Sequence, residues 1–184
     1  MSSQTPDTRI QYDSALALCR EIFVAKLQDY GPSWRIMRPE AITDQLFIKA
    51  KRIRTLQETG TSAVGEGILP EFKALVNYGI IGILQLQQGY ADSSDISNMK
   101  AVEYYDEIAH EARTLMLAKN HDYGEAWRSM RVLSYVDLIL TKIQRIKEIE
   151  DHAGSTKVSE GIDANYFDII NYAIFGIIKL TDEA

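Results

Sequence analysis

Apolar residues recur every three or four positions in six stretches of the chain, which is the spacing of one buried helix face. The pattern predicts helices over about 10–28, 42–58 and 67–88, and again over about 99–121, 134–151 and 160–181. No stretch alternates between apolar and polar residues as a half-buried strand does. We therefore expect an all-α protein built as a helical bundle.

Several residues at the predicted helix ends support these boundaries. Asp7 or Thr8 is the expected N-cap of the first helix. Pro70 falls in the first turn of the third helix, where proline is tolerated. Gly31 and Gly124 each follow an Asp-Tyr pair and are expected to end the first helix of each half. For the two second helices, Thr43 and Ser134 are expected near the start.

The chain contains an internal repeat. AKLQDYGPSWRIMR at 25–38 and AKNHDYGEAWRSMR at 118–131 share nine of fourteen positions, including the only two tryptophans. A shift of 93 residues extends the match through the second predicted helix, and a shift of 94 extends it through the third. Two copies are too few for a solenoid, so we expect a fused pseudo-dimer with pseudo-two-fold symmetry.

The repeat sets the expected domain organisation. We expect a flexible N-terminus over 1–10, repeat one over 11–90, a connection over 91–103 and repeat two over 104–184. A chain of 184 residues is long enough for one compact domain, and the tandem three-helix repeats are expected to form it together.

The composition restricts the possible partners. The net charge of −6 argues against direct nucleic-acid binding and against an anionic membrane as the main partner, because both require basic surface. A nucleotide held through a metal ion is compatible with this charge. The polar N-terminus resembles no secretory leader, and no apolar run reaches membrane-spanning length, so we expect a cytoplasmic protein. A homo-oligomer remains possible.

The last predicted helix carries a candidate metal site. At 100° per residue, Glu160, Asp163, Asp168 and Asn171 share one broad face, and two of them have strongly apolar neighbours. Oxygen ligands of this kind suit Mg²⁺ or Mn²⁺. The alternative is that Arg128 or Lys142 neutralises the carboxylates.

Repeat one lacks part of this acidic set. It has Leu69 in place of Asp163 and Ala74 in place of Asp168. If the cluster is a metal site, repeat two should hold the ion and repeat one should be impaired.

Aromatic and basic residues near the repeated motif are candidates for ligand binding. Tyr123 and Trp127 either plug the core or offer a flat surface to a nucleobase. Arg128 and Arg131 either form internal ion pairs or contact phosphates, to which their forked donors are suited. Lys142 and Arg145 lie three residues apart and so share a helix face, which is either an exposed basic surface or a phosphate contact. Repeat one carries the equivalents Tyr30, Trp34, Arg35, Arg38, Lys49 and Arg52.

Repeat two contains KNHDYG followed by Trp127, then Lys142-x-x-Arg145-Ile146, and then EGID and DIINYAI. These segments resemble the nucleotide-modification-associated domain of phage and bacterial proteins, some of which carry it in tandem. That domain is similar to the all-α nucleoside triphosphate pyrophosphatases, the MazG-like and dimeric dUTPase-like enzymes. In those enzymes E-x-x-E and E-x-x-D on neighbouring helices bind Mg²⁺. Residues 160–163 fit E-x-x-D, whereas Lys142 and Arg145 stand where E-x-x-E is expected.

The resemblance implies a Mg²⁺-dependent pyrophosphohydrolase that acts on a nucleotide, most simply a deoxynucleoside triphosphate. The implied catalytic and metal-binding residues are Glu160, Asp163 and Asp168, with Asp122 and Asp137 as further metal ligands. The implied substrate-binding residues are Tyr123, Trp127, Arg128, Arg131, Lys142, Arg145 and Asn171. The alternative is a non-catalytic nucleotide-binding protein or a partner subunit of a base-modification system. A third possibility is a structural helical protein in which every shared residue serves packing.

Overall fold

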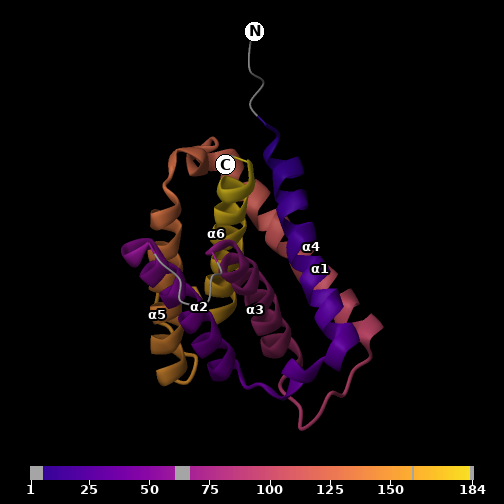
Figure 1. The fold of residues 1–184 in the computed structure, drawn as a ribbon. Coiled ribbons are helices and arrows are strands. Elements are labelled where there is room, and N and C mark those ends of the chain that lie inside the picture. Colours follow the sequence, from indigo (N-terminus) through magenta and orange to yellow (C-terminus); the bar gives the residue numbers. More distant parts are fainter. Residues whose placement is uncertain (1–5, 61–66, 159, 183–184) are drawn as a thin grey trace.

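The computed structural model describes residues 6–60, 67–158 and 160–182, and these residues form helices joined by loops, without a strand (Figure 1). Repeat one contains α1 (Thr8–Tyr30), the short 3₁₀ helix η1 (Ser33–Ile36), α2 (Pro39–Thr59) and α3 (Leu69–Gln88). Repeat two contains α4 (Asn98–Tyr123), the short 3₁₀ helix η2 (Ala126–Ser129), α5 (Val132–Asp151) and α6 (Ile162–Asp182). The predicted all-α fold with two three-helix repeats is confirmed.

The third helices of the two repeats form the centre of the bundle. α3 and α6 pack on each other, with α2 and α5 against one side and α1 and α4 against the other (Figure 1). A helix covered on both sides must be apolar over most of its surface. The apolar stretches around NYGIIGIL and NYAIFGII meet this requirement, and most of their side chains are buried.

Reciprocal contacts show the pseudo-two-fold relation between the repeats. Arg20 on α1 pairs with Asp106 on α4 at 2.7 Å, and Arg113 on α4 pairs with Asp13 on α1 at 2.6 Å. The same two positions of the repeat therefore pair in both directions between the repeats, as in an isologous dimer. The predicted pseudo-dimer is confirmed within a single chain.

Two buried asparagines each connect three helices, drawn from both repeats. Tyr12 on α1 donates its hydroxyl to Asn171 Oδ1 on α6 at 2.7 Å, and Asn171 Nδ2 donates to the Ala112 carbonyl on α4 at 3.1 Å. The equivalent chain runs from Tyr105 on α4 to Asn77 on α3 (2.8 Å) and from Asn77 to the Cys19 carbonyl on α1 (3.0 Å). Both tyrosines and both asparagines are buried, so these hydrogen bonds fix how the outer helices meet the central pair.

Two glycines let the central helices approach closely. A Cβ atom at Gly82 would lie 2.7 Å from the Tyr166 ring, and one at Gly176 would lie 2.7 Å from the Phe72 ring. Phe72 and Tyr166 are equivalent positions of the repeat and are fully buried. Each central helix thus offers a flat glycine surface to the aromatic ring of the other.

The first and second helices of each repeat begin one to three residues earlier than predicted. Asp7 accepts the Arg9 backbone N–H at 2.8 Å and so caps α1, as predicted. α2 and α5 begin at Pro39 and Val132, slightly earlier than expected, and Thr43 and Ser134 lie near these starts, as predicted. Proline is pre-organised for the first helical position, which explains the start of α2.

The first helix of each repeat, α1 or α4, ends later than predicted. The third helix of each repeat, α3 or α6, begins later than predicted. α1 and α4 extend to Tyr30 and Tyr123, and both are followed by a glycine with positive φ. α6 begins at Ile162, so Glu160 lies in the loop before it. Among the helices of the described ranges, none combines the length and the apolar character that a membrane crossing needs.

A polar cluster joins α2, α5 and α6 on the outer side. Thr43 Oγ1 donates to Glu150 Oε1 at 2.7 Å. Burial raises the pKa of the Glu150 carboxyl, and the charges of Glu40, Asp44 and Asp151 raise it further, against the opposing effect of Thr43. An acid whose pKa is raised by folding favours the folded state at low pH and loses that contribution as the pH rises through the folded pKa.

Glu150→Gln is expected to raise the melting temperature at pH 7 by about 1–3 °C, the shift that roughly 0.5–1 kcal/mol produces in a chain of this size. Glutamine keeps an acceptor oxygen for Thr43 and removes the repulsion from three carboxylates. Repeat one already has Gln57 at the equivalent position. Thermal unfolding at pH 7 and pH 4 checks this, because the gain should shrink once the carboxyls are protonated. An unchanged or lower melting temperature at pH 7 contradicts it.

Candidate functional site

Repeat two contains an aromatic pocket of about 340 Å³ between the end of α4, η2 and α6. The Trp127 ring stacks on Phe175 with the ring centroids 4.6 Å apart and the planes 8° apart. Trp127 is 5% exposed, whereas Tyr123 is 73% exposed at the pocket edge. Tyr172 completes the aromatic lining. The pocket has the size and apolar character of a site for a small planar ligand.

A carboxylate between two ammonium groups closes one side of this aromatic pocket. Asp168 accepts from Lys119 Nζ at 2.6 Å and from Lys142 Nζ at 2.7 Å, and its side chain is 12% exposed. Burial alone raises the pKa of the Asp168 carboxyl, but the hydrogen bonds from the two lysines outweigh burial and hold the pKa below its usual value. Asp168 is therefore ionised at neutral pH and presents acceptor oxygens beside the aromatic rings.

A basic groove of about 680 Å³ lies on the other side of the same bridge. Lys142 lines this groove together with Arg145, Lys157 and Glu160. Lys142 also contacts Asp168, so it joins the aromatic pocket to the basic groove. Three cations and two carboxylates, Glu148 and Glu160, line the groove, so positive charge is in excess, which favours an anionic group there.

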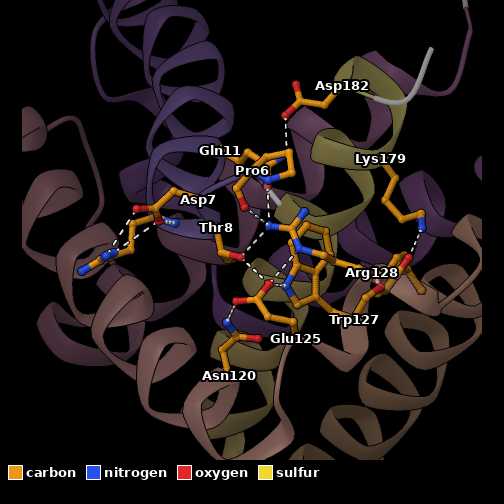
Figure 2. A network of polar contacts seen from close by, with 12 residues as sticks. Pro6, Asp7, Thr8, Gln11, Asn120, Glu125, Trp127, Arg128, Lys179 and Asp182 are labelled. Carbon is orange, nitrogen blue, oxygen red and sulfur yellow. Dashed lines mark hydrogen bonds and ion pairs between the residues drawn. The ribbon is translucent and has the colours of Figure 1, made fainter. Parts of the chain in front are cut away.

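The wall of the aromatic pocket is fixed from behind by a polar network around Arg128 (Figure 2). The Arg128 guanidinium lies 4.5 Å from the centre of the Trp127 ring and donates to Glu125 at 2.8 Å. It also donates to Thr8 at 2.8 Å and Gln11 at 2.7 Å near the start of α1. Glu125, at a positive φ of 66°, accepts from Trp127 Nε1 at 3.1 Å. The network holds Trp127 in one orientation before any ligand arrives.

Arg35 has the same structural role in repeat one. It donates to Asp95 at 2.8 Å and to the Gly89 carbonyl at 2.6 Å, and it also contacts Gln85. Arg35 thus fixes the segment before α4, whereas Arg128 fixes the segment before α1. For these two arginines the contacts favour the internal-pairing interpretation over phosphate binding.

The structure separates the predicted catalytic carboxylates. Asp168 lines the aromatic pocket, and Glu160 is exposed at the basic groove. Asp163 is exposed in the first turn of α6 and lines a third cavity with Glu111 and Phe167. Asp163 and Asp168 are five residues apart, which places them about 140° apart around a helix. Asp163 and Asp168 therefore line different cavities, although both lie on the broad helix face predicted from the sequence.

The two further predicted metal ligands lie elsewhere. Asp122 is exposed at the end of α4 beside His121, and Asp137 on α5 pairs with Arg54 of repeat one. Within residues 6–60, 67–158 and 160–182, no three His, Cys, Asp or Glu side chains lie close enough together to hold a metal ion. The metal-binding role of these carboxylates, and the binding of Mg²⁺ or Mn²⁺, stay predictions.

The predicted substrate-binding residues lie in several places rather than in one site. Trp127, Tyr123 and Lys142 meet at the aromatic pocket or its bridge, and Arg145 is exposed in the basic groove. Asn171 lines the aromatic pocket, but both ends of its amide are engaged in the buried contacts to Tyr12 and Ala112. Arg131 is exposed at the N-cap of α5.

Lys119 belongs to the site and was missed by sequence reasoning. Its signal was its identity with Lys26, three residues before the repeated Asp-Tyr-Gly. Glu125 was missed as well, and here the repeat gives no signal because the equivalent residue is Pro32. Phe175 was not predicted either, because repeat one has Ile81 at the equivalent position and the repeat therefore does not mark it.

A family model described as Nucleotide modification associated domain 1 matches the chain twice, over residues 26–86 and 119–180. Each match lies within one repeat, and together they cover more than half of the chain. No curated protein and no solved structure matches the chain. The likeness to MazG-like pyrophosphatases stays a prediction.

Proposed function

Because the chain belongs to the Nucleotide modification associated domain 1 family, we propose that repeat two is a nucleotide-binding site. The base occupies the aromatic pocket, and the phosphates extend into the basic groove. The observation that carries this proposal is the Lys119–Asp168–Lys142 bridge, which borders both cavities. A ligand that spans this bridge would place a planar apolar end in the aromatic pocket and an anionic end in the basic groove.

The aromatic pocket suits the base. Trp127 and Phe175 form a rigid stacked wall, and the exposed Tyr123 is free to cover the other face of a ring. Asp168 is ionised and accepts hydrogen bonds, so it can read an exocyclic amino group or a ring N–H. Bases with such donors at the bridge are therefore favoured over bases that present only acceptors there.

The basic groove suits the phosphates. Lys142, Arg145 and Lys157 gather there although the whole chain carries a net charge of −6. Charge-assisted hydrogen bonds to phosphate oxygens are about twice as strong as neutral ones. The predicted cytoplasmic location would place such a site among free nucleotides.

Binding without hydrolysis fits the described geometry better than catalysis. Of the three predicted catalytic carboxylates, only Glu160 lies at the basic groove. The pyrophosphohydrolase activity implied by the resemblance stays a second candidate, and the same experiment tests it.

Lys142→Gln is expected to weaken nucleotide binding by tenfold or more, because a charged hydrogen bond contributes about 1.5–3 kcal/mol. Isothermal titration with a panel of deoxynucleoside mono- and triphosphates, with and without Mg²⁺, measures the affinity. Release of pyrophosphate from the triphosphates is followed in parallel.

The matched control for this test is Lys147→Gln. Lys147 lies on the same helix but pairs with Asp44, 3.6 Å away, outside the site. Wild-type protein that binds no member of the panel, or a Lys142 variant that binds as well as the Lys147 variant, contradicts the proposal. Pyrophosphate release by the wild type favours the enzyme instead of the binding protein.

A further inference from the structure

Repeat one contains a second pocket, of about 510 Å³, built from the same positions as the aromatic pocket of repeat two. Trp34 lines it and is 9% exposed, and Tyr30 stands at its edge as Tyr123 does in repeat two. Lys26 and Lys49 line it at the positions of Lys119 and Lys142. We propose that this repeat-one pocket is a second nucleotide site, which selects for phosphate charge rather than for the base. The inference rests on the proposed function of the aromatic frame in repeat two.

The two pockets differ in the position of their lining carboxylate, which is Glu71 in repeat one and Asp168 in repeat two. Ala74 lines the repeat-one pocket where Asp168 lines the other. In repeat two Asp168 engages both lysines, at 2.6 and 2.7 Å. In the part of repeat one that is described, Lys26 has no ion pair. Its ammonium group is therefore available to an anion supplied by a ligand.

The one buried acid of the repeat-one pocket is already matched. Glu71 is 3% exposed, pairs with Arg52 and lies 3.6 Å from Lys49 Nζ. This distance is longer than both lysine contacts of Asp168, so Glu71 holds Lys49 more loosely than Asp168 holds its two lysines. The pocket therefore keeps one uncompensated cation beside Trp34.

The geometry also indicates where the ligand's charge would lie. The Asp168 carboxylate marks the position between two ammonium groups where negative charge is stabilised. With only the Ala74 methyl group there, a phosphate has room at the equivalent position, and the repeat-one pocket is correspondingly the larger of the two. The carboxylate of the repeat-one pocket, Glu71, is already paired with Arg52, so base donors meet no carboxylate at the position that Asp168 has in repeat two. We therefore expect it to prefer triphosphates over monophosphates for every base.

The two tryptophans allow each pocket to be observed alone, because each pocket contains one of them. In Trp127→Phe the remaining Trp34 reports on repeat one, and in Trp34→Phe the remaining Trp127 reports on repeat two. Titration with the deoxynucleoside mono- and triphosphates should change the Trp34 emission saturably, with at least tenfold tighter binding of triphosphates.

Variants of the repeat-one pocket are then added to the Trp127→Phe protein. Lys26→Gln and Ala74→Asp should each weaken the triphosphate response of Trp34 tenfold or more, the second by supplying an internal anion. Lys51→Gln is the control, because Lys51 lies two residues from Lys49 on α2 and so projects to another side. A Trp34 signal that no nucleotide changes, or that Lys26→Gln leaves intact, overturns the inference.

The outcomes separate the two proposals. A response of Trp127 alone overturns the second site and leaves the site in repeat two standing, whereas a response of Trp34 alone does the reverse. If a tryptophan variant fails to fold, titration calorimetry of the chain with both tryptophans decides. Two triphosphate sites per chain that fall to one in Lys26→Gln support the inference, and one site unaffected by that change overturns it.

Discussion

Replacing Asn171 with alanine is expected to lower the free energy of unfolding by about 2–5 kcal/mol, because two buried groups each lose a partner worth roughly 1–3 kcal/mol. The Tyr12 hydroxyl and the Ala112 carbonyl both depend on this one amide. Tyr12 is fully buried, so water cannot replace the lost bond. Urea unfolding measures the effect as a lower midpoint at an unchanged slope.

The repeat offers a matched variant and a control. Asn77→Ala removes the equivalent bonds to Tyr105 and to the Cys19 carbonyl and should cost a similar amount. Asn165→Ala removes only a bond to the Gly161 carbonyl in the first turn of its own helix and should cost less. An Asn171 variant as stable as the Asn165 variant contradicts the prediction. If it were stable but unable to bind nucleotide, the role predicted from the sequence, contact with the substrate, would be favoured.

Gly176→Ala is expected to destabilise the protein by about 1–3 kcal/mol, the usual cost of overpacking a core. The new methyl group would lie 2.7 Å from the Phe72 ring, which is fully buried. Alanine is favoured over glycine in a helix by about 1 kcal/mol, so the clash must exceed that gain for the sign to hold.

Unfolding of three glycine variants checks this prediction. Gly82→Ala meets the Tyr166 ring at the same distance and should behave alike. Gly67→Ala is the control, because no atom lies within 4 Å of its Cβ position and its φ is not positive. A double variant of Gly176→Ala with Phe72→Leu should recover part of the loss if the ring causes it. Equal stability of the Gly176 and Gly67 variants would show that the central helices can separate at little cost.

The fold could be predicted from the sequence because two independent patterns agreed. Helical periodicity located six helices, and the repeat paired them into equivalent halves. The ends were less certain, since local signals compete there. Thr43 is a good capping residue, but Pro39 stands earlier and starts α2, and the Thr43 hydroxyl instead reaches Glu150 across the helix interface. Such a long-range partner leaves no mark in the local sequence.

The candidate site was only partly predictable for a related reason. Trp127 and Lys142 were found because the repeat preserves them, and Asp168 was found because a carboxylate among apolar residues needs a partner. The same reasoning selected Asn171, because a buried structural amide and a ligand contact have identical apolar neighbours in a sequence. Asp163 was grouped with Asp168 by a broad helical arc, but packing around α6 divides that arc between two cavities.

The start of α1 and the end of α6 lie in contact. Gln11 Nε2 near the start of α1 donates to Asp182 Oδ2 at the end of α6 at 2.7 Å, so the beginning and the end of the described chain meet. Arg128 donates a hydrogen bond to the Pro6 carbonyl before α1, and Arg35 donates one to the Gly89 carbonyl in the connection before α4. The described helices therefore form a nearly closed ring, in which the end of α6 lies beside the start of α1. Moving the break between α6 and α1 to the connection before α4 would permute the gene circularly while leaving every core contact in place.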